Sequence, residues 1–266
     1  MRKSRASKKR TRLRYGPRKY AGFHLLLCRW LRLHGDGSKH YCYVTLGGTE
    51  LRDIQGLRFA DMNLTSSVWS YETSEKRYEL AKQTASDLTT YGVTVDVQCA
   101  TFFSHKRQSD LPHIFFVDLT GICAWGDYHL RFGELFQNEV IREGDCLLIT
   151  SHLGHHRGLK EIRKHFAGEP AVLGVDEDDD GRVRSVYRRA HPTMTLFKAL
   201  SLNGIQAELH LHCFGTVKYH DVDHTPMGIY GYTVSAGTTE LRTLVWDSST
   251  NYFDVNEGRL CSGDTF

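Results

Sequence analysis

The sequence has no long apolar run and no segment of the secretion-signal type. No apolar stretch in its 266 residues approaches the roughly 18 residues needed to span a membrane. The first fourteen residues, MRKSRASKKRTRLR, lack the apolar centre of a secretion signal. We therefore expect a cytoplasmic protein that makes no membrane contact.

Paired spacings of cysteine and histidine are also missing. The seven cysteines do not show the spacing of a disulfide framework, so we expect reduced thiols. Neither CxxC nor HExxH occurs, although these are compact ligand patterns of zinc sites, and no metal site is predicted. The acidic run DEDDD at 176–180 is typical of a solvated loop.

The first twenty residues contain no acid. They carry ten Lys or Arg, so the remaining 246 residues have a net charge of −7 although the whole chain has +3. Such a segment has too few apolar side chains to bury and is predicted to be a disordered basic arm. It is typical of an arm that follows nucleic-acid phosphates; a solubilising tail or a targeting address is the alternative. The predicted phosphate contacts are Arg2, Lys3, Arg5, Lys8, Lys9, Arg10, Arg12, Arg14, Arg18 and Lys19.

Apolar periodicity predicts an α/β domain behind this arm. Residues 21–40 have the apolar spacing of an amphipathic helix that packs on the core, and 41–240 form the domain itself. A C-terminal strand (LRTLVW, 241–246) and a tail complete the chain at 241–266. Short apolar runs, separated by segments of helix length, favour a mostly parallel sheet buried on both faces. The runs lie at 41–46, 68–71, 94–98, 113–117 and 146–150.

Glycines and polar side chains follow several of these strands. In an open parallel sheet, ligands bind beyond the carboxyl ends of the strands. Gly47 and Gly48 follow the first strand, where they either let a ligand approach the backbone or form a tight turn. Glu72 follows the second strand, where a carboxylate can hold ribose hydroxyls, and Asp118 follows the fourth. His152, after the fifth strand, is a candidate general base or phosphate contact, or a surface histidine.

Eight segments follow one another in an order of strands, loops and helices: LGGTEL, EKRYELAKQTASDL, TVDVQCATFF, FFVDLTG, REGDCLLIT, PTMTLFKALSLNGI, ELHLHCFGTVKYHD and MGIYGYTVSAG. This order resembles that of class I S-adenosylmethionine-dependent methyltransferases. FVDLTG is similar to a motif of tRNA guanine dimethyltransferases, and the layout is similar to partner proteins of three-Cys-motif systems.

The resemblance implies a Rossmann-like fold with a seven-stranded sheet in the order 3-2-1-4-5-7-6, helices on both faces, and only strand seven antiparallel. It implies S-adenosylmethionine as cofactor, held by Gly47, Gly48 and Glu72, with Ala100 and Thr101 beside the adenine. Asp118 would hold the methionine amino group or the substrate, and it could instead be a helix cap or turn acid.

Two functions remain open from the sequence. The first is a methyltransferase that acts on nucleic acid. The second is a catalytically inactive methyltransferase-like subunit that binds or scaffolds within a nucleoprotein complex, with a protein partner. The loop LGGTEL replaces the family's E/D-x-G-x-G-x-G, and Ala100 and Thr101 stand where an acid commonly contacts adenine, which keeps the second function in consideration.

Overall fold

The structure is a computed structural model. It describes residues 17–34, 40–59, 64–118, 128–152, 208–220, 226–237, 252–254 and 259–261. The predicted acidic loop, the helix PTMTLFKALSLNGI and the strand LRTLVW lie outside these residues, so they stay predictions. No helix in the described ranges has the length and apolar character required to cross a bilayer.

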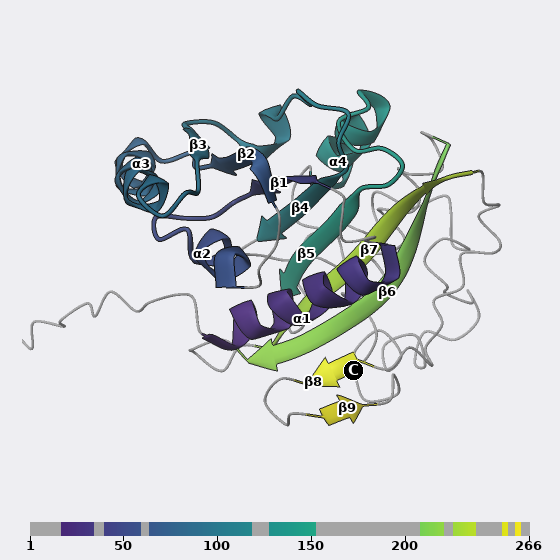
Figure 1. Cartoon of the computed structure of the whole chain (residues 1–266). Coiled ribbons are helices and arrows are strands. Elements are labelled where there is room, and N and C mark those ends of the chain that lie inside the picture. The colour runs from purple at the N-terminus through teal and green to yellow at the C-terminus, as the bar shows by residue number, and fades with distance from the viewer. Residues whose placement is uncertain are drawn as a thin grey trace, which may run out of the picture.

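A single mixed sheet organises the described chain (Figure 1). Its strands are β1 (Tyr41–Thr45), β2 (Leu64–Tyr71), β3 (Val95–Gln98), β4 (His113–Asp118), β5 (Cys146–His152), β6 (Leu209–His220), β7 (Pro226–Ala236), β8 (Tyr252–Asp254) and β9 (Arg259–Cys261). They are arranged in the order β3-β2-β1-β4-β5-β7-β6-β8-β9. Strands β1 to β5 pair in parallel, and β7 pairs antiparallel with both β5 and β6. The predicted methyltransferase-type order, with β7 antiparallel, is therefore confirmed.

Two short strands extend the sheet beyond the seven that were predicted. Strand β8 pairs in parallel with β6, and β9 pairs antiparallel with β8. Each has three residues, which is too short for a pattern of alternating burial to be visible in the sequence. Their pairing depends on the edge that β6 offers, because an unpaired strand edge presents free N–H and C=O groups.

Helices cover both faces of the sheet, as predicted. The described helices are α1 (Pro17–His34), α2 (Arg52–Phe59), α3 (Glu75–Thr89), the short 3-10 helix η1 (Phe102–Ser104) and α4 (Tyr128–Gln137). Helices α1, α2 and α3 share one apolar core with the sheet, and α4 and η1 share the other. Neighbouring residues of β1 show the alternation, since Tyr43 belongs to the first core and Val44 to the second.

Helix α1 lies across β6 and β7 (Figure 1). Phe23, Leu26, Leu27 and Trp30 form its inward stripe, and none is more than 2% exposed. Their i, i+3, i+4, i+7 spacing is that of one helical face. The helix begins at Pro17, four residues before the predicted boundary between arm and helix, because proline is well suited to the first position of a helix.

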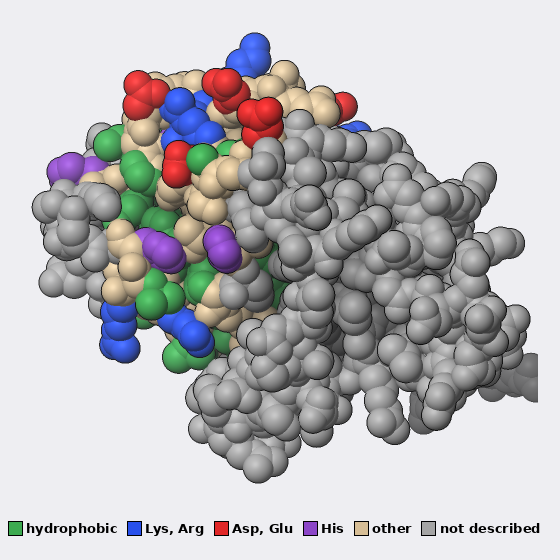
Figure 2. Space-filling view, turned by 90° about the vertical axis from the view of Figure 1, so that its right-hand side faces the viewer, with side chains coloured by type: hydrophobic (Ala, Val, Ile, Leu, Met, Phe, Trp, Pro, Cys, Tyr) green, Lys and Arg blue, Asp and Glu red, His purple; other side chains and the backbone are tan. Residues whose placement is uncertain are grey.

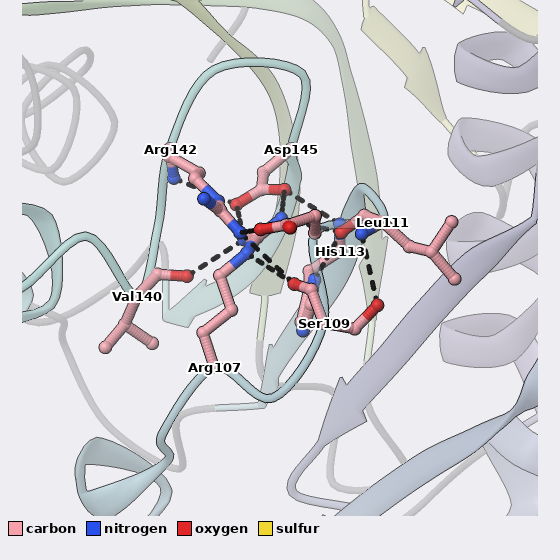
Figure 3. Close-up of polar contacts among 8 residues, drawn as sticks. Arg107, Ser109, Leu111, His113, Val140, Arg142 and Asp145 are labelled. Carbon is pink, nitrogen blue, oxygen red and sulfur yellow. Dashed lines mark hydrogen bonds and ion pairs between the residues drawn. The ribbon is translucent and has the colours of Figure 1, made fainter.

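A buried ion pair fixes the amino-terminal ends of β4 and β5, opposite the edge where ligands were predicted. Asp145 accepts from the Arg107 guanidinium (Nη1 to Oδ2, 2.8 Å) and from the backbone N–H groups of His113 (2.7 Å) and Arg142 (2.9 Å). Arg107 also donates to the Leu111 carbonyl oxygen at 2.6 Å. Figure 3 shows these groups converging on the Asp145 carboxylate. Because Asp145 is fully buried, we interpret the network as a structural connection between the two strands.

Candidate functional site

Strand register brings several predicted site residues to one edge of the sheet. Thr45 of β1 pairs with Ser70 of β2 and with Phe116 of β4. Gly47 follows Thr45 by two residues and Asp118 follows Phe116 by two, so both lie at the same level beyond their strands. Strands β2 and β3 end at the same edge, which places Glu72 and Ala100 there as well.

The two glycines after β1 have separate steric requirements. A Cβ atom on Gly47 would lie 2.8 Å from Leu51 Cδ2 and 3.0 Å from Ser70 Oγ, so the site has no room for a side chain. Gly48 has a φ of +59°, the left-handed region that favours glycine. The tight turn that the sequence suggested is therefore present, and it brings the backbone close to β2.

A buried carboxylate lies beneath this turn. Asp53, in the first turn of α2, is 1% exposed and accepts from Tyr43 Oη (2.8 Å) and Thr45 Oγ1 (2.6 Å) through its Oδ2 atom. Burial raises the pKa of Asp53, and the hydrogen bonds from Thr45 and Tyr43 act in the opposite direction. Asp53 Oδ1 and Ser70 Oγ are buried without a hydrogen-bond partner among the described atoms, and both face Gly47. The underside of the turn is thus polar.

Glu72 lies half-buried at the tip of β2. Its Oε1 atom accepts from the backbone N–H of Ser74 at 3.0 Å, just before α3 begins. Its backbone N–H donates to the Gln98 carbonyl oxygen at 3.0 Å, which fixes the residue relative to β3. Oε2 has no hydrogen-bond partner among the described residues, so Glu72 can stabilise the start of α3 and still accept from a ligand hydroxyl.

Ala100 and Thr101 lie after β3, at the same edge. The Thr101 side chain accepts from the Phe103 backbone N–H at 3.4 Å and caps η1. Ala100 is half-buried against the core on the α4 side. These two residues therefore have structural roles in the turn that leads to η1, and neither offers a charged group to a ligand.

Both carboxylate oxygens of Asp118 are engaged by the chain itself. Lys19 Nζ donates to Oδ2 in an ion pair, and Thr150 Oγ1 donates to Oδ1 at 2.7 Å. The side chains of Lys19 and Asp118 are only 5% and 9% exposed. Lys19 is therefore not the exposed phosphate contact that its place in the predicted arm implied, since its ammonium is buried at the edge of the sheet.

Two buried histidines, His105 after η1 and His113 at the start of β4, contact aromatic side chains of β2. His105 Nδ1 is 2.7 Å from Tyr71 Oη, and His113 stacks on Trp69 with ring centroids 5.9 Å apart. Burial, and then the Arg107 charge, lower the pKa of His105 to about 4 and that of His113 to about 3. Both rings are thus neutral in the folded protein near neutral pH.

The remaining predicted site residues are placed only in part. His152 is the last residue of β5, opposite Met227 of β7, and its side chain lies outside the described part. Residues 1–16 also lie outside it, and Arg18 is exposed on the first turn of α1. No group of three metal-ligating side chains occurs among the described residues.

Asp53 was missed in the sequence, and Lys19 was predicted in a different role, as an exposed phosphate contact, although signals for both burial sites were present. Lys19 precedes Phe23 and Leu26 at i+4 and i+7, so it lies on the inward face of α1. Asp53 likewise precedes the buried Ile54 and Leu57 within α2. In each case a charged residue interrupts an apolar stripe, which is a sign of a buried polar contact.

Comparison with known proteins gives similarity of structure only. Neither the protein-family models nor the curated proteins contain a significant match to the sequence. An S-adenosylmethionine-dependent methyltransferase from Clostridium acetobutylicum is 12% identical, with 82% of this chain and 92% of that chain covered and a TM-score of 0.49. Magnesium protoporphyrin IX methyltransferase from Synechocystis is 13% identical, with 81% of this chain and 82% of that chain covered and a TM-score of 0.47. A proposed RNA methyltransferase from Pyrococcus horikoshii is 10% identical, with 81% of this chain and 82% of that chain covered and a TM-score of 0.43.

The strand order and directions define the class to which this fold belongs. The described sheet contains the seven-stranded arrangement of the Rossmann-like methyltransferase fold, with β8 and β9 added at one edge. At the identities and TM-scores above, the similar structures carry no conclusion about activity.

Proposed function

We propose that this protein binds S-adenosylmethionine at the carboxyl edge of β1, β2 and β4 and transfers its methyl group to a nucleic acid. The observation that carries the proposal is Glu72, which is half-buried at the tip of β2 with Oε2 available to a hydroxyl. The tight glycine turn at 47–48 lies at the same edge. An acid beyond the second strand and glycines beyond the first suit the ribose end of such a cofactor.

The chain's own residues would bind and orient the reactants. The bound cofactor would supply a methyl group on a sulfonium centre, so the protein need only hold the acceptor in line with it. Lys19 and Thr150 each donate to one carboxylate oxygen of Asp118. These two contacts give the carboxylate a fixed position beside the glycine turn. His152 and the arm at residues 1–16 are proposed contacts to the acceptor nucleic acid.

A second candidate is a binding or scaffolding subunit without turnover, joined to a protein partner. It is favoured by the state of Asp118, whose two oxygens are already occupied by Lys19 and Thr150. It is also favoured by Ala100 and Thr101, which serve the η1 turn. Both candidates keep the basic arm as a contact to nucleic acid.

Calorimetric titration with S-adenosylmethionine and S-adenosylhomocysteine tests the cofactor proposal. The expected result is saturable binding of both ligands by the full-length protein. The methyltransferase proposal then requires transfer of labelled methyl groups to RNA or DNA. Binding without transfer to either would favour the scaffolding candidate, and absence of binding would contradict the cofactor site.

A further inference from the structure

The outward face of α1 carries a row of cations. Arg18, Arg29 and Arg32 are exposed, and Leu25, which is 43% exposed, lies among them. At about 100° per residue, these four positions fall within an arc of about 60° on the helix. The opposite face of α1 is occupied, because its apolar stripe is buried against the sheet. The cationic face therefore points away from the core.

Helix α1 itself offers no acidic side chain to pair with Arg29 or Arg32. Helix α1, PRKYAGFHLLLCRWLRLH, contains no Asp or Glu. Within the described residues, no ion pair or hydrogen bond engages Arg29 or Arg32. Figure 2, which views the molecule from the right-hand side of Figure 1, shows Lys and Arg side chains both at the bottom of the described part and at the top, where acidic side chains lie beside them. Helix α1 itself thus carries cations and no acid, and a face of this kind attracts a polyanion.

Helix stability does not account for the whole row. A cation near the carboxyl end of a helix, such as Arg32, interacts favourably with the helix dipole. Arg18 is in the first turn, where the dipole disfavours a positive charge, and Arg29 is in neither terminal turn. At least two of the three cations are therefore placed without benefit from the dipole.

The geometry fits a strand of nucleic acid. From Arg18 to Arg32 the helix rises about 21 Å, at about 1.5 Å per residue. Phosphates of one strand of a duplex follow each other at about 3.4 Å along the helix axis, so about six would span this length, and a more extended single strand places fewer phosphates there. Exposed Leu25 and Leu33, 43% and 58% exposed, can contact unstacked bases, which a single strand presents and a duplex does not. A membrane surface fits less well, because the apolar stripe of α1 is already buried in the core.

We propose that the outward face of α1, formed by Arg18, Leu25, Arg29 and Arg32, is a binding surface for single-stranded nucleic acid that continues the track of the basic arm onto the folded domain. The inference rests on the nucleic-acid part of the proposed function, and it does not depend on cofactor binding. The strand reaches the sheet edge along α1, because the helix begins where Lys19 contacts Asp118.

The test is the salt dependence of binding to a labelled single-stranded RNA of about twenty nucleotides, with a duplex of the same sequence and anionic vesicles as other probes. In the full-length protein, R29Q/R32Q should reduce the slope of log affinity against log salt by about 1.4, at about 0.7 per phosphate contact. Affinity at about 0.1 M salt should fall about 10- to 30-fold. Leu25→Ser removes an apolar contact to unstacked bases, so it should weaken binding to the single strand. Because it removes no charge, it should leave the slope of log affinity against log salt unchanged.

The matched control is K76Q/R77Q. Both residues are exposed on α3, which packs beside the edge strand β3, and the change in net charge is the same. This variant should bind as the unmodified protein does. Equal losses in the α1 and α3 variants would mean that only net charge matters, and an α1 variant with unchanged binding would overturn the surface directly.

The outcomes separate this inference from the proposed function. Equal affinity for the duplex and the single strand, or tighter binding to vesicles, would overturn the assigned partner. If the full-length protein binds neither nucleic acid, the nucleic-acid part of the proposed function fails and this surface fails with it. If deletion of the arm weakens nucleic-acid binding and R29Q/R32Q does not, the proposed function stays intact and the α1 surface is overturned.

Discussion

The ammonium group of Lys19 lies against Asp118 Oδ2, although 99 positions separate the two residues in the chain. Lys19 belongs to the first turns of α1, and Asp118 is the last residue of β4. The ion pair therefore joins the N-terminal helix to the edge of the sheet at which the glycine turn and Glu72 also lie. It makes the start of α1 part of the candidate site.

The first prediction concerns this pair. Lys19→Met should lower the free energy of unfolding by about 3 to 5 kcal/mol, because it leaves the buried Asp118 carboxylate without its counter-charge. Urea unfolding followed by circular dichroism measures the effect. Arg18→Met is the matched control. It removes the same charge from the neighbouring residue, whose side chain is exposed.

The double variant Lys19→Met/Asp118→Asn separates the loss of the pair from the loss of packing. It removes both charges, so it should recover much of the lost stability. A double variant as unstable as Lys19→Met would show that the lysine stem, and not the unpaired carboxylate, accounts for the loss.

The second prediction concerns the cofactor. Glu72→Ala should weaken S-adenosylmethionine binding by about 1.5 to 3 kcal/mol, the range for a lost hydrogen bond to a charged group. Calorimetric titration of the folded variant measures it. Glu75→Ala, in the exposed first turn of α3, controls for the loss of an acid near the helix start. If both variants bind S-adenosylmethionine with equal affinity, Glu72 does not hold the cofactor and serves only to accept from the Ser74 N–H.

The third prediction concerns the arm. Deletion of residues 1–16 removes eight Lys or Arg and retains all of α1. Nucleic-acid binding should weaken at least about tenfold with a flatter salt slope, because fewer phosphates are neutralised. The melting temperature should stay nearly unchanged.

Deletion of residues 1–20 provides the comparison. It also removes Lys19, so its melting temperature should fall well below that of the shorter deletion. If the two truncated proteins melt together, the pair between Lys19 and Asp118 does not contribute to stability. Unchanged nucleic-acid binding in both would identify the arm as an address or a solubilising tail.

The fourth prediction concerns pH. His105 and His113 have pKa values of about 4 and about 3 in the folded protein, below the ordinary histidine pKa of 6.5, because both rings are buried. Below pH 6.5 the unfolded chain takes up protons that the folded chain refuses, so stability is complete above this pH and declines as pH falls toward 4. Each histidine contributes up to about 1.4 kcal/mol per pH unit in this window.

Urea unfolding between pH 4.5 and 7.5 measures the slope. His105→Gln and His113→Gln should each flatten it by about one proton, whatever their effect on stability at neutral pH. Slopes unchanged in both variants would assign the acid sensitivity to other groups.

Much of the fold could be predicted because its signals are local. The apolar run HIFFV became β4, and the run CLLIT became β5, since short buried strands need only a few adjacent apolar side chains. Glu72 could be placed at an edge because the residue after a parallel strand lies at that edge. Its half-burial and its contact with Ser74 could not be predicted, because they depend on how α3 leaves the strand.

The sequence by itself determined the alternation of strands and helices, the mostly parallel character of the sheet and the separation of the basic first twenty residues from a body of net negative charge. Only the tertiary structure decided which charges meet. Lys19 could have been one more exposed cation, and Asp118 a free ligand for an amine. The packing of α1 on β6 and β7 brought them together, and once both were shielded from water each needed the other. Such a choice of partner is a property of the assembled core, because no local pattern specifies which distant residue a buried charge will contact.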